Sequence, residues 1–184
     1  MKGIVFNLLQ EVVVAEHGEK TWDALLVAAG VSGAYSSLGN YPDEELGRIV
    51  GAASRALHTP PQDVVRWFGR KAIPLLAKNH PGYFAPHRHA LEFLLTLNTI
   101  IHPEVRKLHR DAVVPEFQFE TPAPNVLQIG YQSPRRLCAL AEGFIQGAAD
   151  YYGETLALEH PTCMLRGDES CVLIARFAVA RRAA

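Results

Sequence analysis

A histidine at the end of an apolar run is the first residue with a chemistry of its own. The stretch ALEFLLTLNTII, residues 90–101, precedes His102, and Pro103 follows it. A neutral imidazole in such surroundings needs a partner for each ring nitrogen. One interpretation is a core histidine bonded to a backbone carbonyl. The other is a metal ligand, with haem iron as the leading candidate and Nε2 as the coordinating atom, for which Pro103 would fix the direction of the side chain.

A second group of polar side chains lies in the stretch YQSPRR, which begins at Tyr131. Tyr131 and Ser133 lie two apart at the end of a predicted strand, so both side chains point the same way. Arg135 follows in the first turn of a predicted helix, from which it can swing back towards them. Two hydroxyls, a guanidinium and a helix N-terminus make an anion receptor, and haem propionates are suitable guests. The alternative is a strand-to-helix corner, with Ser133 as the N-cap and Arg135 as a surface charge.

Three cysteines form the third group: Cys138, Cys163 and Cys171. Their odd number argues against a disulfide framework. A hairpin turning about residues 166–169 would place Cys163 opposite Cys171, with their Cβ atoms ~5 Å apart. With His160 and with Cys138 on a neighbouring helix, they make a tetrahedral zinc set of three thiolates and one imidazole. The alternatives are buried thiols that pack as small hydrophobes, or thiols that sense oxidants and release a metal on oxidation.

The segments that position these side chains are predicted to be helical up to about Pro115. Apolar residues at helical spacing, with glycine, proline and capping signals at the ends, predict helices over residues 4–18, 21–30 (with Thr21 as N-cap), 41–59, 61–82 and 87–102. Pro74 predicts a kink or break in the fourth of these helices. Pro103 is expected to redirect the chain before a short helix restarts with the proline in its first turn.

After Pro115 the pattern changes to strands. Residues 116–120 alternate with period two, and residues 125–132 also fit a strand. Ser133 and Pro134 are predicted to open a helix that runs to about residue 153, and a hairpin follows it. Helices followed by a small antiparallel sheet, interrupted by one helix, predict an α+β fold.

Composition limits the classes of protein to which the chain can belong. It has 184 residues, of which 48% are hydrophobic and 20% charged, with a net charge of -1. These values fit one globular domain and argue against a nucleic-acid-binding protein. The apolar stretch near the N-terminus is interrupted by Asn7, Gln10 and Glu11, so we interpret it as a helix rather than a signal peptide. No apolar run reaches the ~18 residues of a membrane span, and we expect a cytoplasmic protein.

Taken together, these features resemble one known family. The sequence is similar to haem nitric oxide/oxygen binding (H-NOX) domains, the family of the haem domain of soluble guanylate cyclase. The matching segments are the opening MKGIVFNLL, HPEVRKL from His102, PEF from Pro115 and YQSPRR from Tyr131. The resemblance implies a single domain over 1–184, with a helical distal part over roughly 1–65 and a proximal part, helix and sheet, over roughly 66–184. Haem b would be buried between these parts and held without a covalent bond, since no C-x-x-C-H motif is present.

The resemblance also assigns roles to individual residues. His102 matches the proximal ligand of the iron, and Pro115 matches the proline that packs on the porphyrin and bends it. The propionate-binding triad corresponds to Tyr131, Ser133 and Arg135. Some family members carry zinc at the positions of the three cysteines and His160, which adds a structural Zn²⁺ to the expected cofactors.

One segment departs from the family pattern. His109-Arg110 stands where the family usually has Tyr-Pro. In a straight helix His109 would come near the face of His102 and offer a second ligand. The expected break at Pro103 argues against that arrangement.

The residues expected on the distal side of the haem decide which gas binds. Oxygen-binding members have a tyrosine at the position of Leu140, which donates a hydrogen bond to O₂. The other distal positions match residues that also lack a donor: Val5, Leu9, Pro74 and Phe144. Bound O₂ carries partial negative charge and needs a donor, whereas NO and CO do not. The resemblance therefore implies a sensor that binds NO and CO and rejects O₂, in which NO weakens the iron–histidine bond and lets the helix of His102 shift.

We expect a non-enzymatic sensor whose output is delivered in trans. Stand-alone bacterial members of the family regulate a histidine kinase or a cyclic-di-GMP synthase or phosphodiesterase. The alternative is a zinc/thiol redox switch acting on the same kind of partner, which would keep its function after His102→Gly and lose it after Cys163→Ser. A haem peroxidase is disfavoured because the distal positions lack a His/Arg acid–base pair.

Overall fold

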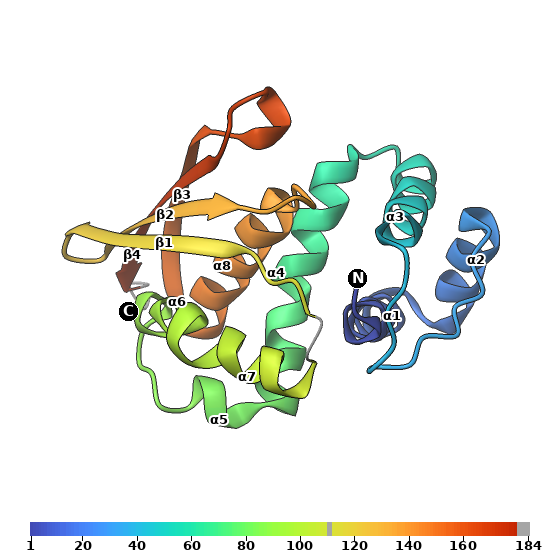
Figure 1. Cartoon of the computed structure of the whole chain (residues 1–184), viewed down its shortest axis with the longest axis horizontal. Coiled ribbons are helices and arrows are strands. Elements are labelled where there is room, and N and C mark those ends of the chain that lie inside the picture. The colour runs from blue at the N-terminus through green and yellow to red at the C-terminus, as the bar shows by residue number, and fades with distance from the viewer. Residues whose placement is uncertain (110–111, 180–184) are drawn as a thin grey trace, which may run out of the picture.

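Three helices form the N-terminal lobe of the molecule. The computed structural model describes residues 1–109 and 112–179 (Figure 1), and the lobe consists of α1 (Gly3–His17), α2 (Glu19–Ala29) and α3 (Asp43–Leu57). All three helices were predicted, and Gly30 ends α2 in the left-handed conformation as expected. The predicted N-cap Thr21 is wrong. Gly18 is the N-cap of α2, and the Thr21 hydroxyl instead donates to the carbonyl of His17, 2.8 Å away.

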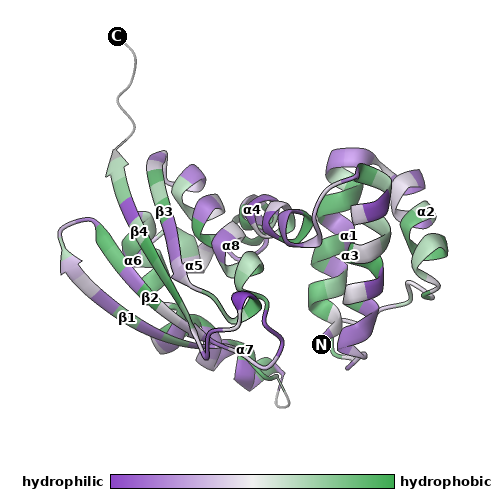
Figure 2. Ribbon diagram, turned by 90° about the horizontal axis from the view of Figure 1, so that it is seen from above, coloured by the Kyte–Doolittle hydropathy of each residue, from purple (hydrophilic) through white to green (hydrophobic). Residues whose placement is uncertain are grey.

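Two long helices join this lobe to the rest of the molecule. Helices α4 (Pro61–Asn79) and α8 (Cys138–Tyr151) lie side by side between the lobes, as the view from above shows (Figure 2). Glycines allow their backbones to approach closely: a Cβ added to Gly143 would lie 2.1 Å from the carbonyl oxygen of Arg66. Helix α4 continues through Pro74, so of the predicted kink or break the break is wrong, and the kink stays a prediction.

The chain then passes through short helices that end at the segment carrying His102. These are α5 (Pro81–Phe84), α6 (Ala90–Leu95), the π-helix η1 (Leu97–Ile101) and α7 (His102–Leu108). The single helix predicted over 87–102 is therefore wrong in part, because a π-turn interrupts it. Pro103 lies in the first turn of α7, as predicted. The redirection of the chain predicted at Pro103 is wrong, because η1 runs directly into α7 and both Ile101 and His102 have helical backbone angles.

Four antiparallel strands form one sheet in the order β1-β2-β4-β3. They are β1 (Glu116–Ala123), β2 (Val126–Gln132), β3 (Glu154–Thr162) and β4 (Cys171–Val179). Alternate residues of the two central strands, including Leu127, Ile129 and Leu173, are buried in the core that α8 covers. The predicted α+β fold and the final hairpin are confirmed.

The corner between β2 and α8 differs from the prediction. Ser133 and Pro134 were expected to open the helix, but α8 begins at Cys138. The Ser133 hydroxyl accepts a bond from the backbone N–H of Arg135, 3.3 Å away, and Arg136 has a φ of 51°. This local side-chain bond competes with helix formation, and the left-handed residue ends the turn. Arg135 consequently lies in a turn and not in the helix.

Each lobe has its own hydrophobic core. One surrounds Phe6 and Ile49 in the N-terminal lobe, and the other surrounds Phe93 and Leu173 beneath the sheet. Phe144 of α8 packs against both cores, so this helix connects them. In the described part of the chain, no helix has the length and apolar character needed to cross a membrane.

Candidate functional site

His102 lies half-buried at the start of α7, next to the sheet. Its ring stacks on that of Phe117 in β1, with centroids 5.7 Å apart and planes inclined by 23°. Burial, followed by the charge of Arg106, lowers the pKa of His102 to about 4. The imidazole is therefore neutral near pH 7, the form in which histidine binds a metal.

Tyr131, one of the predicted anion-binding residues, is linked to His102 through the ring of Phe117. The ring of Tyr131 lies 5.6 Å from that of Phe117, which thus contacts both Tyr131 and His102. Tyr131 and Ser133 are buried, and burial raises the pKa of Tyr131. The backbone bond between Arg135 and Ser133 holds the third member of the triad beside them. The guanidinium itself donates to the carbonyl of Val113 at 2.8 Å and to Asp43 at 2.7 Å.

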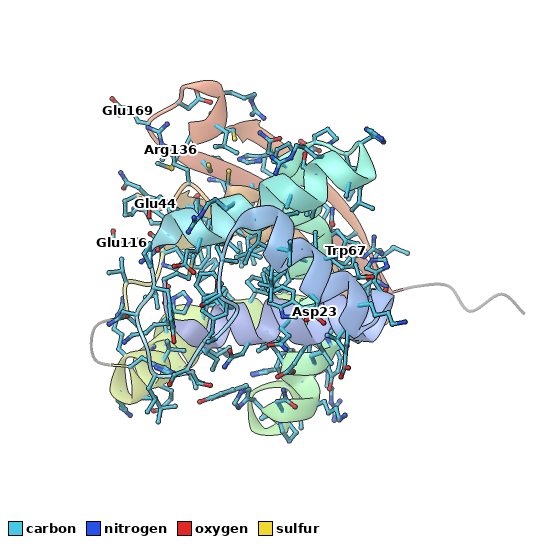
Figure 3. All side chains as sticks on the ribbon, turned by 90° about the vertical axis from the view of Figure 1, so that its right-hand side faces the viewer. Asp23, Glu44, Trp67, Glu116, Arg136 and Glu169 are labelled. Carbon is cyan, nitrogen blue, oxygen red and sulfur yellow. The ribbon has the colours of Figure 1, made fainter. Side chains whose placement is uncertain are left out.

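Asp43 connects the two lobes at this point. One of its oxygens binds the terminal ammonium of Met1 at 2.5 Å, and the other binds Arg135. Glu44 and Arg136 directly follow Asp43 and Arg135 in the sequence, and Figure 3 shows both at the same edge of the molecule. Burial alone would raise the pKa of Asp43, but the bonds from Met1 and Arg135 outweigh it and lower the pKa. The available signal in the sequence was an acidic first turn, which suits any helix N-terminus.

A small cavity opens between α1, α7 and the segment before β1. Its volume is about 110 Å³, and its lining combines Val5, Val105, Val113 and Val114 with His109 and Arg135. His109 is buried, and its Nδ1 has no hydrogen-bond partner among the described residues. The structure thus places His109 on this cavity together with Val5 and Arg135, a neighbourhood that sequence reasoning did not predict.

Most of the residues predicted to face a distal ligand gather in one cluster. Leu9 is buried in the N-terminal core, and Val5, Leu140 and Phe144 pack against that core. Pro74 does not join them, since it is exposed on α4. Pro115 is half-buried directly before β1. None of these predicted distal residues carries a side-chain hydrogen-bond donor, whereas the same core also holds Trp22, and Tyr35, Tyr41 and Trp67 pack against it.

These residues fit a haem in their chemistry. A neutral imidazole, two buried hydroxyls, a guanidinium and an apolar lining match the iron, propionates and ring of a porphyrin. The cavity volume lies below the roughly 300–1,000 Å³ of small-molecule sites. Arg135 lines this cavity, but His102, Tyr131 and Ser133 do not, so the fit to haem rests on the chemistry of these residues and not on the cavity.

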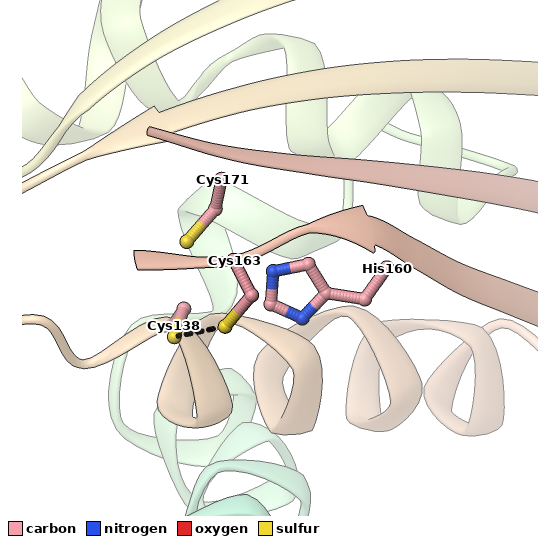
Figure 4. Close-up of side chains that lie close together, drawn as sticks. All are labelled: Cys138, His160, Cys163 and Cys171. Carbon is pink, nitrogen blue, oxygen red and sulfur yellow. Dashed lines mark hydrogen bonds between the residues drawn. The ribbon is translucent and has the colours of Figure 1, made fainter. Parts of the chain in front are cut away.

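The cysteines and His160 form a separate cluster (Figure 4). The ligand atoms of Cys138, His160, Cys163 and Cys171 all lie within 4.8 Å of one another, and the sulfurs of Cys138 and Cys163 are 3.7 Å apart. All three cysteines are buried, and burial together with the neighbouring thiols raises the pKa of Cys138 to about 12. Three sulfurs and one imidazole nitrogen at such spacing suit tetrahedral Zn²⁺.

A carboxylate that sequence reasoning missed lies against this cluster. Glu142 of α8 accepts a hydrogen bond from Nδ1 of His160 and another from Arg66 of α4, which also binds Asp63. Burial alone would raise the pKa of Glu142. The two hydrogen bonds outweigh burial, so the pKa of Glu142 lies below its usual value. Its position four residues after Cys138 was the available signal, since that spacing places both on one face of a helix.

Comparison with known proteins decides the family. The model of the haem-NO-binding family matches residues 2–160. The chain belongs to this family. Its fold is that of an H-NOX domain, and the family consists of haem-based gas sensors.

Solved structures agree with this assignment. The chain is 34% identical to an H-NOX protein from Shewanella oneidensis in the Fe(II)NO state, with a TM-score of 0.89 and coverage of 97% of this chain and 99% of that one. An H-NOX domain from Shewanella oneidensis in the Fe(II)CO state gives 34% identity, 97% and 99% coverage and a TM-score of 0.86. An oxygen-binding H-NOX domain related to soluble guanylate cyclases gives 20% identity, 100% and 99% coverage and a TM-score of 0.83, which shows a shared fold alone. A search among curated proteins finds no match.

Proposed function

We propose that this H-NOX domain is a nitric oxide sensor that binds NO and CO, but not O₂, at a haem held by His102. The observation that carries the proposal is the half-buried, neutral imidazole of His102, stacked on Phe117 next to Tyr131. When bound, ferrous haem b supplies the iron at which the gas binds. Tyr131, Ser133 and Arg135 would hold its propionates, and Pro115 would pack on its ring.

The choice of gas rests on the apolar residues predicted to line the distal side of the haem. Val5, Leu9, Leu140 and Phe144 offer no side-chain donor to a bound diatomic ligand. Pro74 remains a predicted member of this lining, although it is exposed on α4. Such a lining leaves the partial negative charge of O₂ unstabilised and is neutral towards NO and CO. The relatives solved with NO and CO support this assignment.

Absorption spectra of the haem-loaded ferrous protein test the proposal. We expect separate Soret shifts with NO and with CO, and under air only slow oxidation. A stable complex with O₂ would contradict the gas assignment. Absence of a Soret band after addition of haem would contradict haem binding as a whole.

We also propose that the sensor acts in trans on a histidine kinase or a cyclic-di-GMP synthase or phosphodiesterase, without catalysis of its own. The element that would carry the signal is the π-turn η1 joined to α7, because His102 lies at their junction. The rate of partner autophosphorylation or cyclic-di-GMP turnover, measured with the ferrous protein before and after NO, tests this output. An effect of NO that persists in His102→Ala would contradict it.

A second proposed component is a structural Zn²⁺ at Cys138, His160, Cys163 and Cys171. The convergence of the four ligand atoms within 4.8 Å supports it. We expect one zinc per chain by elemental analysis, and its loss in Cys163→Ser. The 3.7 Å between two of the sulfurs also supports the alternative of a thiol redox switch. In that case oxidation would change the partner's activity in His102→Gly but not in Cys163→Ser.

A further inference from the structure

A chain of polar contacts leads from the cysteine cluster to helix α4. It runs from His160 to Glu142, from Glu142 to Arg66, and from Arg66 to Asp63. The side chains of His160 and Glu142 are 11% and 10% exposed, so this pair is shielded from water. None of the described cysteines takes part in these hydrogen bonds, and neither does His102. This series of hydrogen bonds is therefore separate from the cysteines and from His102.

The contact with Glu142 determines how His160 faces the cysteines. An ionised carboxylate only accepts hydrogen bonds, so Nδ1 of His160 carries the proton. The lone pair then lies on Nε2, which is buried and has no hydrogen-bond partner in the described part of the chain. Figure 4 shows this nitrogen directed towards the sulfurs of the cysteines. An unpartnered buried acceptor aimed at three thiols is ready to coordinate a cation.

Arg66 keeps Glu142 ready for this role. Its Nε–H donates to one carboxylate oxygen while His160 occupies the other, so both oxygens have a partner. Its second donor binds Asp63 on the same helix, which restricts the guanidinium. A carboxylate held in this way orients a metal-binding histidine and raises its basicity.

We propose that Glu142 and Arg66 are positioning residues of the Cys/His metal site, which hold Nε2 of His160 towards the cation and link metal binding to the contact between α4 and α8. The inference rests on the proposed zinc site. Cys138 opens α8, Glu142 follows it by one turn, and Gly143 lies against the backbone of Arg66. A bound Zn²⁺ consequently connects β3, β4 and α8, and Glu142 extends this connection to α4.

The chain offers a matched control for the charge pair. Arg70 and Asp150 also join α4 to α8, through two bonds of 2.5 and 2.9 Å, but do not contact a metal ligand. Asp150→Asn and Arg70→Met thus remove a similar ion pair from the same interface. Glu142→Gln keeps the shape of Glu142 but replaces one of its two oxygens by an NH₂ donor. Because His160 and Arg66 bind different oxygens, one of them loses its acceptor.

The experiment measures Zn²⁺ affinity by competition with a chromogenic chelator, and ligand geometry by the visible absorption of Co²⁺ bound in place of Zn²⁺. We expect Glu142→Gln to weaken Zn²⁺ binding by about 10–100-fold and to change the Co²⁺ spectrum. Arg66→Met should weaken binding less, and Asp150→Asn and Arg70→Met should leave both readouts unchanged. Added Zn²⁺ should raise the melting temperature of the wild type by more than that of Glu142→Gln.

Equal Zn²⁺ affinity and equal Co²⁺ spectra in wild type and Glu142→Gln would overturn the inference while leaving the zinc site intact. A wild type that binds neither ion would overturn the zinc site and the inference with it, and the two failures are thus distinct. If Glu142→Gln does not fold, Arg66→Met against Arg70→Met decides. Loss of affinity in both arginine variants alike would assign the effect to general weakening of the helix pair and overturn the inference.

Discussion

His102 combines an unusual position with an ordinary side chain. Its ring lies on Phe117, away from compensating acids, and burial keeps the imidazole neutral well below pH 7. Iron competes with protons for the same lone pair, so a low pKa leaves the nitrogen available. The surroundings of His102 thus keep its imidazole in the neutral, metal-binding form in the absence of haem.

Replacing His102 by alanine should reduce haem affinity at least about tenfold, equivalent to ~1.4 kcal/mol. The reason is loss of the single proposed bond from protein to iron. Titration of the haem-free protein with haem, followed by the absorbance of the Soret band, measures this change. His17→Ala, on the exposed end of α1, serves as the control and should bind haem as the wild type does. An unchanged spectrum in His102→Ala would exclude this histidine as the ligand.

Leu140→Tyr should confer O₂ binding on the ferrous protein. The substitution introduces a phenol donor into an apolar cluster, and a hydrogen bond to a partly charged ligand contributes about 1.5–3 kcal/mol, or roughly 10–150-fold in affinity. Spectra under air before and after the substitution measure the effect. Leu140→Phe adds a similar ring without the hydroxyl and should not bind O₂; equal behaviour of the two variants would show that the donor is irrelevant.

At the level of the elements, the packing of α4 on α8 concerns both candidate sites. The two helices touch through glycines, and α8 carries the proposed metal ligand Cys138, the carboxylate Glu142 and the predicted distal residues Leu140 and Phe144. A displacement of α8 relative to α4 would therefore move residues of both candidate sites. Close packing makes such a contact sensitive to a single added methyl group.

Gly143→Ala should destabilise the protein by about 1–3 kcal/mol, because its Cβ would lie 2.1 Å from the carbonyl oxygen of Arg66 and force the helices apart. Thermal unfolding monitored by circular dichroism measures the change. Gly47→Ala is the matched control: it lies inside α3 with open space around the added carbon and should stabilise by about 0.5–1 kcal/mol. A melting temperature for Gly143→Ala at or above that of the wild type would contradict the close contact.

Across the whole molecule, Asp43 and Arg135 hold the two lobes together at the mouth of the cavity. The carboxylate belongs to the N-terminal lobe, and the guanidinium belongs to the corner that follows the sheet. The same guanidinium is proposed to bind a propionate, so haem binding and the contact between lobes compete for it.

The contribution of Asp43 to stability should depend on pH. Its pKa in the folded protein lies below the usual ~3.9, so its stabilisation is fully present above that value and is lost as the pH falls through the folded pKa. Melting temperatures of wild type and Asp43→Asn should therefore differ at neutral pH and converge in acid. Asp23→Asn, on the exposed face of α2, is the control and should follow the wild type. A difference that stays constant down to acid pH would show that the charge of Asp43 is not responsible.

Local sequence was sufficient to predict much of this protein. Glycine and proline signals placed most helix ends, alternation placed the strands, and residue types with their order along the chain singled out His102 and the cysteine cluster. The predictions of helices and strands succeed because helix periodicity, strand alternation and turn chemistry depend on neighbours within a few residues. They failed at Ser133 and Thr21, where a hydroxyl bonds its own local backbone instead of capping a helix.

The contacts between residues far apart in the sequence depend on how the two lobes pack, and local sequence patterns did not predict them. Arg135 meets Asp43 across 92 residues, and Arg66 meets Glu142 across 76. Each of these side chains has an ordinary local explanation as a helix-end charge or a surface ion. Their partners depend on the angle and distance at which α3, α4 and α8 pack, which are set by the summed burial of both cores rather than by any short pattern.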